Sequence, residues 1–374
     1  MYDCIIVGAG PAGGAAAYHL AKKGRSVLIL EQESLPRYKP CVGGVSPVIG
    51  EWFDFDFSPA ISLKINTIRY TWKMDDPVEV KLDTAEPMWM VRRDRFDHFL
   101  VQQAQKQGAT LQDGTAVTGI QFNSDRWQVN TAQGPQTGRF LIAADGAKGP
   151  MAKWLGFKEP KTSPGATLEI SLNGSATEKA EFEFGLAKNG YIWTFPKADG
   201  YSIGVATFRG NDRQNLGQVL REYAQSTGMQ LQNPRQYDHP LSLWDGDRKL
   251  HSQNALLAGE AASIVDPLTG EGVRPAIATG IKAATAIDQA LSGNSNALEQ
   301  YTEAIVQEWG SDLVWAQRLA GVFYRIPGVS YRLGVKRPAA TRRMGQILCG
   351  QLRYGDIANF AIKKLSTGLI PGRG

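Results

Sequence analysis

The sequence has few of the residues that build disulfide frameworks and metal centres. It contains only three cysteines, Cys4, Cys41 and Cys349, and four histidines in 374 residues. The cysteines are odd in number and far apart, and the histidines are scattered, so neither shows the spacing of a zinc or iron–sulfur site. We therefore expect free thiols, a reducing compartment and no metal.

Long apolar runs are also missing. No stretch of eighteen uncharged apolar residues occurs, which argues against a transmembrane helix. A core strand begins directly after Met1 and leaves no room for a signal peptide, so we expect a cytoplasmic protein. At 374 residues the chain is long enough for two packed units or for one domain with a second inserted into it.

Negative charge is nearly absent from the end of the chain. Residues 313–374 hold eleven Lys or Arg and one acid, Asp356, whereas the first 312 residues sum to about −5. Interleaved with apolar residues, these cations could make a peripheral membrane contact, each contributing about 1 kcal/mol near anionic lipid. A solvated basic helix face explains the pattern equally well. No nucleic-acid-binding module accompanies the charge, so nucleic acid is not an expected partner.

The first 32 residues have the pattern of a dinucleotide-binding β-α-β unit. An apolar strand, a G-x-G-x-x-G motif, a helix and a second strand follow one another at residues 4–7, 8–13, 14–23 and 26–30. An acid, Glu31, closes the second strand eighteen residues after Gly13. A lone glycine motif is weak evidence, but the full set of elements favours a nucleotide site.

Each residue of this unit has a physical task. Gly8 permits the sharp turn, Gly10 lets the backbone approach a pyrophosphate, and Gly13 lets the helix pack closely on the strand. The helix N-terminus favours the phosphates. Glu31 would accept hydrogen bonds from a ribose. At about 4 Å and intermediate dielectric it would repel a 2′-phosphate by roughly 4 kcal/mol per charge pair, which argues against NADP in this pocket and leaves FAD or NAD. The residues that we expect at the nucleotide are Gly8, Gly10, Ala12, Gly13, Glu31 and Gln32.

The rest of the chain does not continue as a simple strand and helix alternation. Apolar strands return at residues 139–145 and near 255, and helices are expected at 95–106 and 272–291. Between them lie period-two segments, including residues 61–72 and 88–91, that predict an antiparallel sheet. We expect a nucleotide-binding domain from residues 1–60, 92–160 and 250–300, a substrate domain from 61–91 and 161–249, and a helical region at 301–374.

Three further motifs follow the glycine motif in a fixed order. Arg93 opens R-x-x-F, Asp145-Gly146 follows a strand, and LLAGEAASIVDPLTGEGV contains Gly259-Glu260 and G-E-G-V. Over roughly residues 1–291, this set resembles the flavoproteins of the p-hydroxybenzoate hydroxylase fold. The resemblance implies an α/β fold: a Rossmann-like FAD-binding domain with an inserted antiparallel β-sheet substrate domain and a helical C-terminal region, with FAD as cofactor.

The same resemblance assigns residues to the cofactor. Arg93 is implied near the FAD phosphates or ribityl chain, and Glu260 at a ribityl hydroxyl, although the family usually has Gly-Asp there and Glu260 is one methylene longer. The helix that starts after G-E-G-V would place amides where reduced flavin carries negative charge. The implied residues are Arg93, Asp145, Gly146, Gly259, Glu260, Gly270, Gly272 and Val273.

Two stretches resemble the geranylgeranyl reductase family of FAD-dependent oxidoreductases. YIWTFPKADGYSIGVA, residues 191–206, is similar to its Y-x-W-x-F-P motif, and PRYKPCVGG, residues 36–44, to its cysteine-bearing loop. The resemblance implies Cys41, Tyr191 and Trp193 as catalytic residues. Tyr191 and Trp193 would share one sheet face as an aromatic wall for an isoprenoid, or simply fill a core, which spacing alone favours.

Cys41 has two interpretations. Its thiol could donate the proton that alkene reduction requires, or it could be a small packing residue. The departures at Gly204-Val205-Ala206 and Arg274-Pro275 from the family pattern leave the shape of the pocket open.

The resemblance implies reduction of C=C bonds in a prenyl chain by hydride transfer from reduced flavin. No second G-x-G-x-x-G follows a strand, so NAD(P)H would bind transiently as donor, or ferredoxin would replace it. The alternative is an FAD-dependent monooxygenase acting on an aromatic or quinone-like substrate, although the halogenase signature W-x-W-x-I-P is missing. A non-enzymatic flavin-binding interaction protein is the least favoured function.

Overall fold

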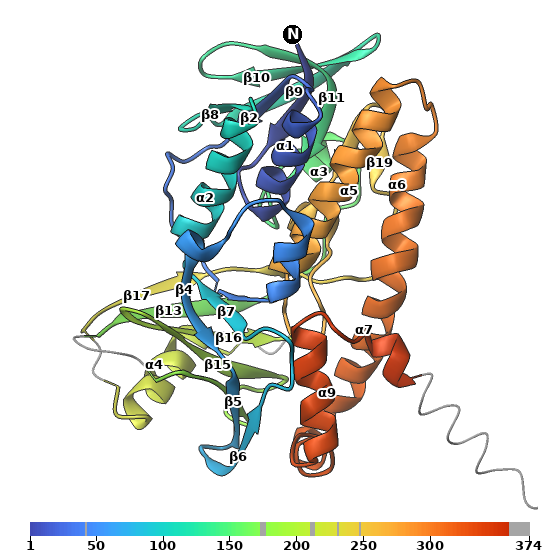
Figure 1. Ribbon diagram of the computed structural model, residues 1–374. Helices are drawn as coiled ribbons and strands as arrows, with labels where there is room; N and C mark the ends of the chain where they lie inside the picture. Colours follow the sequence, from blue (N-terminus) through green and yellow to red (C-terminus); the bar gives the residue numbers. More distant parts are fainter. Residues whose placement is uncertain (42, 173–176, 210–213, 230–231, 247, 359–374) are drawn as a thin grey trace, which may run out of the picture.

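The first large sheet contains the N-terminal strand at its centre. The computed structural model describes residues 1–41, 43–172, 177–209, 214–229, 232–246 and 248–358. The sheet has the order β19-β20-β11-β1-β2-β8, with β10 pairing β11 and β9 pairing β10 (Figure 1). Its strands are β1 (Tyr2–Val7), β2 (Val27–Leu30), β8 (Thr110–Gln112), β9 (Val117–Asn123), β10 (Arg126–Thr131), β11 (Gln136–Ala143), β19 (His251–Ser252) and β20 (Ala255–Leu257).

Four parallel strands of this sheet end on one row. Val7 of β1 pairs with Leu30 of β2 and with Ala143 of β11, and Ala143 pairs with Leu257 of β20. These four residues are the last of their strands. Ligands of open α/β sheets bind outside the carboxyl ends of the strands, so the register brings four distant segments to one edge.

Helices cover this sheet and pack closely on one another. They are α1 (Pro11–Lys22), α2 (Arg93–Lys106), α3 (Met151–Trp154), α5 (Val273–Leu291) and α6 (Ala297–Ile305), and α1, α2 and α5 lie side by side in Figure 1. A Cβ on Gly13 would lie 1.9 Å from the carbonyl oxygen of Gly8, and one on Gly280 would lie 2.2 Å from that of Ala12. Only glycine permits this approach of α1 to β1 and to α5.

The second large sheet has seven strands in the order β17-β13-β16-β15-β14-β5-β6. One face packs against α4 (Leu216–Ser226), and the other carries an aromatic cluster shared with the C-terminal helices. The strands are β5 (Thr67–Trp72), β6 (Asp75–Lys81), β13 (Gly165–Ser171), β14 (Lys179–Phe184), β15 (Gly190–Lys197), β16 (Gly200–Thr207) and β17 (Gln232–Asp238), and the pair β12 (Thr162–Ser163) and β18 (Leu241–Ser242) stands apart.

Residues 61–72, predicted as one strand, are two strands in different sheets. β4 (Ile61–Ile65) joins β3 (Gly44–Val45) and β7 (Met88–Val91) in a three-stranded sheet, whereas β5 begins after Asn66 and joins the large one. Ile61 of β4 packs with β3, β7 and α2, whereas Ile65 packs with β5 in the aromatic cluster of the second sheet. The prediction of a purely antiparallel sheet is also wrong, since β5 and β14 are parallel. The predicted domain boundaries stay a prediction.

The end of the described chain is helical. It consists of the π-helical turn η4 (Val306–Gly310), α7 (Ser311–Phe323), α8 (Pro327–Ser330), the π-helical turn η5 (Tyr331–Val335) and α9 (Pro338–Leu348). No helix in the described part of the chain is long and apolar enough to cross a membrane. Residues 359–374, the last part of the predicted helical region, lie outside the described residues. The remaining short helices are η1 (Pro47–Trp52), η2 (Ser58–Ala60) and η3 (Gly259–Ala262).

Candidate functional site

A cavity of about 450 Å³ lies at the carboxyl edge of the first sheet. Residues that follow the four aligned strands line it: Gly8 and Glu31 come directly after β1 and β2, and Asp145 and Gly259 come two residues after β11 and β20. The second sheet contributes Gly165, Ala166, Thr167, Trp193 and Val205 to the opposite wall. The cavity therefore lies between the two large sheets.

All but two of the predicted site residues line this cavity. Gly13 is buried in α1, where it fulfils the predicted packing on Gly8. Tyr191 is buried in the aromatic cluster of the second sheet instead. The predicted residues in the cavity wall are Gly8, Gly10, Ala12, Glu31, Gln32, Cys41, Arg93, Asp145, Gly146, Trp193, Gly259, Glu260, Gly270, Gly272 and Val273.

The amino end of α1 forms one end of the cavity. The N-cap residue Gly10 offers no side-chain hydrogen bond to the first turn, so amide groups of this turn are available to an anion. A Cβ on Gly10 would meet nothing within 4 Å, which leaves room for a ligand against the backbone. The Glu31 carboxylate is fixed beside this turn, because it accepts hydrogen bonds from the amides of Ala9 (2.9 Å) and Glu33 (3.2 Å).

A buried charge network connects Glu31 with Arg93. Arg37 lies 3.4 Å from Glu31 and donates a hydrogen bond to Asp97 at 2.8 Å. Arg93 donates two further hydrogen bonds to Asp97, at 2.7 and 2.8 Å. Although burial opposes ionisation of Asp97, Arg93 and Arg37 hold its pKa below the usual range. Arg93 thus forms part of the cavity wall with much of its guanidinium bound to Asp97.

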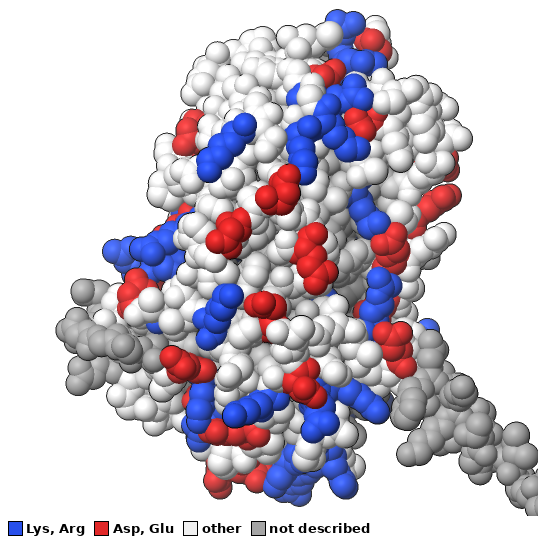
Figure 2. Space-filling view, in the orientation of Figure 1, with Lys and Arg blue, Asp and Glu red and all other residues white. Residues whose placement is uncertain are grey.

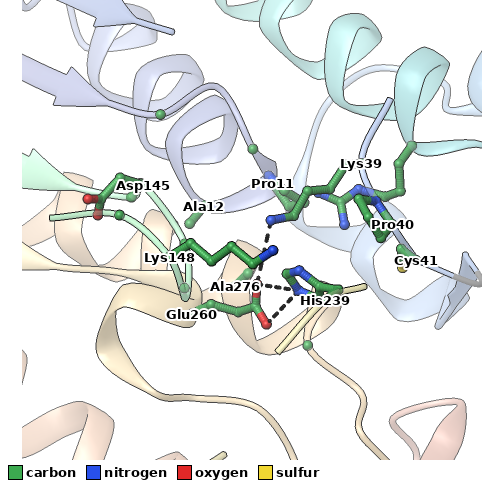
Figure 3. Close-up of a pocket in the computed structure, with 18 of the residues that line it drawn as sticks. Pro11, Ala12, Lys39, Pro40, Cys41, Asp145, Lys148, His239, Glu260 and Ala276 are labelled. Atoms are coloured by element: carbon green, nitrogen blue, oxygen red, sulfur yellow. Dashed lines mark hydrogen bonds and ion pairs between the residues drawn. The ribbon is translucent and has the colours of Figure 1, made fainter. Parts of the chain in front are cut away.

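Glu260 reaches across the cavity to the second sheet. Its carboxylate oxygens lie 3.1 and 3.2 Å from Nε2 of His239, just beyond β17, and 3.9 Å from the ammonium of Lys39 (Figure 3). Burial opposes its charge, but His239, Lys39 and Arg93 lower the pKa of Glu260. The methylene by which Glu260 exceeds the usual aspartate lengthens its reach toward His239, which no sequence pattern had indicated.

Two polar atoms in the wall are buried without a partner among the described residues. Oδ2 of Asp145 accepts a hydrogen bond from the amide of Met151 at 2.9 Å, whereas its Oδ1 has none. The indole nitrogen of Trp193 has none either. Buried polar groups in folded proteins are nearly always hydrogen-bonded, so these two atoms depart from the rule, and both belong to residues of the cavity wall. Burial raises the pKa of Asp145 to about 6.

The loop before α5 forms the other end of the cavity. Asp266 holds it by accepting hydrogen bonds from the amides of Leu268 (2.7 Å) and Thr269 (3.1 Å). The hydroxyl of Tyr191 donates to the Thr269 carbonyl at 2.5 Å, so this predicted catalytic residue supports the loop from outside the cavity. Trp193 is the member of the aromatic motif that lines the cavity.

Cys41 lies where the loop after β2 meets the second sheet. Its sulfur accepts a hydrogen bond from the Gly43 amide at 3.3 Å. The next residue, Gly44, lies against Phe195, because a Cβ there would be 2.3 Å from the ring. Cys41 helps to raise the pKa of Arg93 against the effect of burial, and burial lowers the pKa of nearby Lys197 to about 8. The thiol therefore has cations on two sides.

Several polar cavity residues were not predicted from the sequence, among them Arg37, Tyr38, Lys39, Lys148 and His239. Three of them belong to the PRYKPC stretch, whose two cations could have indicated an anionic ligand. Tyr38 donates a hydrogen bond to Glu169 of β13 and stacks on Tyr237, with ring centroids 4.0 Å apart, so this stretch also joins the two sheets.

The cavity suits a dinucleotide with a ring system. Free amides and glycine occupy one end, the basic side chains Arg37, Lys39 and Lys148 belong to the lining, and Asp145 and Trp193 complete it. Within the described residues no group of His, Cys, Asp or Glu could hold a metal ion. These residues fit FAD, which would supply redox chemistry at its isoalloxazine ring.

Asp145 should make the stability of the FAD-free protein depend on pH. Its folded-state pKa of about 6 exceeds the unfolded value near 4, so the folded state binds more protons between these values and stability falls as pH rises through this window. We expect the free energy of unfolding of the wild type to fall by on the order of 2 kcal/mol between pH 4 and pH 7, relative to that of Asp145→Asn, which lacks this titrating group. Urea unfolding at both pH values measures this. The exposed Asp83→Asn is the control, and an equal difference at both pH values would contradict the assignment.

Comparison with known proteins identifies the cofactor domain. Residues 1–239 match the family described as FAD binding domain. An uncharacterised protein of Methanosarcina barkeri is 31% identical over 294 residues, which cover 78% of this chain and 75% of that protein. Digeranylgeranylglycerophospholipid reductase 1 of Methanothermobacter thermautotrophicus is 27% identical over 341 residues, or 83% of this chain and 84% of that protein.

Two solved structures share the fold. A geranylgeranyl bacteriochlorophyll reductase-like protein of Thermoplasma acidophilum has a TM-score of 0.77 at 22% identity and covers 94% of this chain and 92% of its own. A flavin-dependent brominase has a TM-score of 0.73 at 18% identity, with 98% and 99% covered. These likenesses show the fold alone, a mixed α/β fold with an FAD-binding domain of the p-hydroxybenzoate hydroxylase type. With the matching family and its motifs, the chain belongs to the geranylgeranyl reductase family of FAD-dependent oxidoreductases.

Proposed function

We propose that this protein reduces C=C bonds in the prenyl chain of an isoprenoid or prenylated molecule. Bound FAD, once reduced, supplies the hydride, and NAD(P)H serves as the transient electron donor. The relative named digeranylgeranylglycerophospholipid reductase supports this substrate class. The monooxygenase alternative has no specific observation in the cavity that favours it.

The observation that carries the proposal is a group of apolar side chains in the cavity lining. They are Trp193, Val205, Leu241 and Val265. Val265 lies 3.2 Å from the position of a Cβ on Gly272, and Leu241 lies 3.5 Å from one on Gly270. A prenyl chain has no hydrogen-bonding groups, so such walls bind it by burial of apolar surface.

Three features of the chain near the loop before α5 have separate roles in this proposal. The amino terminus of α5, which lacks a side-chain cap, would stabilise negative charge on the cofactor ring. Trp193 would form the wall against which the prenyl chain lies. Cys41, at the opposite wall, would donate the proton that completes the saturated bond. We also propose that the chain divides into a FAD-binding domain and a substrate domain. The enzyme is cytoplasmic in this proposal and touches the membrane through its basic C-terminal region.

The proposal is tested without oxygen. The purified holoprotein is reduced, mixed with geranylgeranyl diphosphate, and followed by flavin absorbance and product mass. We expect flavin reoxidation together with a gain of two hydrogens for each reduced bond, and no reoxidation with the fully saturated analogue. Reoxidation that occurs only when oxygen and an aromatic substrate are added would contradict the proposed reductase function and favour the monooxygenase.

Replacing Cys41 tests its role as proton donor. We expect Cys41→Ser to retain FAD and to be reduced by the donor at the normal rate, while alkene-dependent reoxidation slows about 100-fold, a typical effect of losing a general acid. Cys349→Ser changes a buried cysteine outside the cavity wall and should leave reoxidation unchanged. Undiminished turnover in Cys41→Ser would contradict a role as proton donor and leave Cys41 as a packing residue.

A further inference from the structure

Five large apolar side chains are exposed close together near the end of the described chain. They lie on α7, on the turn after it, on α8 and on η5. We call them the apolar patch: Leu319 (41% exposed), Val322 (62%), Ile326 (48%), Val329 (48%) and Leu333 (63%). Single exposed apolar residues are normal on soluble proteins, but five of them within the one helical segment 319–333 point to a surface that another molecule covers.

The chain segment that carries the apolar patch has charge of one sign. Residues 313–355 contain no acid, and exposed arginines alternate with the patch residues along the chain at Arg318, Arg325, Arg332, Arg337 and Arg342. Within the described residues none of these five forms an ion pair with an acid, whereas neighbouring Lys336 pairs with Asp76 at 2.7 Å. Figure 2 shows basic side chains, with acidic ones among them, at the end of the molecule where α9 and β6 lie.

The apolar patch rests on a stack of aromatic rings that leads to the cavity. Tyr324, between Val322 and Ile326, stacks on Phe208 with centroids 5.2 Å apart, and Phe208 stacks on Tyr191 at 5.4 Å. Tyr191 in turn contacts Trp193 at 5.1 Å. The Tyr324 hydroxyl also donates to the Leu268 carbonyl at 2.8 Å. The patch is therefore held rigidly on the aromatic cluster that borders the proposed prenyl site.

A second cavity, of about 370 Å³, borders the patch. It extends from Gly321 and Arg325 to Pro267 in the loop before α5. Its lining contains the cations Lys161, Arg209 and Arg325 and a single acid, Asp245. Positive charge thus continues from the patch toward the proposed active site.

We propose that the apolar patch docks the protein on an anionic lipid bilayer, with its side chains among the acyl chains and the surrounding arginines at the head groups. Apolar area and cationic charge together give stable binding at the membrane interface, where neither alone suffices. A second copy of this chain fits less well, because a symmetric contact would bring two sets of unpaired arginines together. The inference rests on the proposed function, since a prenyl substrate resides in such a bilayer.

The test is flotation of the full-length holoprotein with vesicles of phosphatidylcholine containing phosphatidylglycerol. We expect binding that weakens with salt and falls more than tenfold on neutral vesicles. Val322→Glu/Leu333→Glu should lower the affinity for anionic vesicles more than tenfold. The control Gln121→Glu/Gln133→Glu adds the same charge at exposed positions near the β9–β10 hairpin, at the other end of the molecule (Figure 1), and should bind almost as the wild type.

Three outcomes would overturn the docking surface. The first is an affinity of Val322→Glu/Leu333→Glu for anionic vesicles equal to that of the wild type. The second is an equal loss of affinity in the control variant, and the third is failure of the wild-type protein to bind anionic vesicles. A concentration-dependent dimer that the same substitutions abolish, seen by sedimentation without lipid, would replace the bilayer with a second copy. If the glutamate variant fails to retain FAD, Arg325→Gln/Arg332→Gln takes its place, with an expected loss of affinity and a shallower salt dependence; wild-type values would again overturn the proposal.

Flavin reoxidation by a short, water-soluble prenyl diphosphate separates this inference from the proposed function. Val322→Glu/Leu333→Glu should reoxidise with that substrate as the wild type does, although it no longer floats with vesicles. A wild-type protein that floats but reduces no prenyl substrate would contradict the proposed function and leave the docking surface standing.

Discussion

The parallel register of β2, β1, β11 and β20 is the constraint on which the rest of the structure depends. Because Leu30, Val7, Ala143 and Leu257 lie on one row, the loops that follow them leave the sheet at the same edge. Parallel strands need crossover connections, and the crossovers here are long enough to contain most of the second sheet. The same register thus assembles the nucleotide end of the cavity and places the second sheet above it.

Ion pairs hold several charged side chains in and behind the cavity wall. Glu31 and Asp97 share Arg37, and Glu260 faces His239 and Lys39. These pairs offset the cost of burying charge and tie the loop after β2 to both sheets. Asp145 is the exception, buried with one oxygen unpartnered, and the cost appears as its raised pKa. Sites that bind ligands commonly retain such unsatisfied groups.

Much of the nucleotide end could be predicted because its residues follow directly from strand ends. Gly8, Glu31 and Gly259 each stand immediately or two residues after an apolar run, so periodicity and motif spacing place them together. Residues that act through long-range pairing could not be found this way. His239 reaches Glu260 only because β17 ends above the first sheet, and the direction of the Tyr191 hydroxyl depends on the Thr269 carbonyl. The break at Asn66 was missed because alternation continues through residues 61–72, while long-range pairing joins β4 to β7 and β5 to β6 and β14.

The central claim is that one continuous cavity binds a dinucleotide at the α1 end and carries out alkene reduction at the Trp193 end. A crystal structure of the holoprotein tests it most directly. The account predicts the adenosine ribose at Glu31, the pyrophosphate at the amino end of α1, and the isoalloxazine ring between the Gly270–Val273 segment and Trp193. A ring bound away from Trp193, or a ribose that does not meet Glu31, would contradict it.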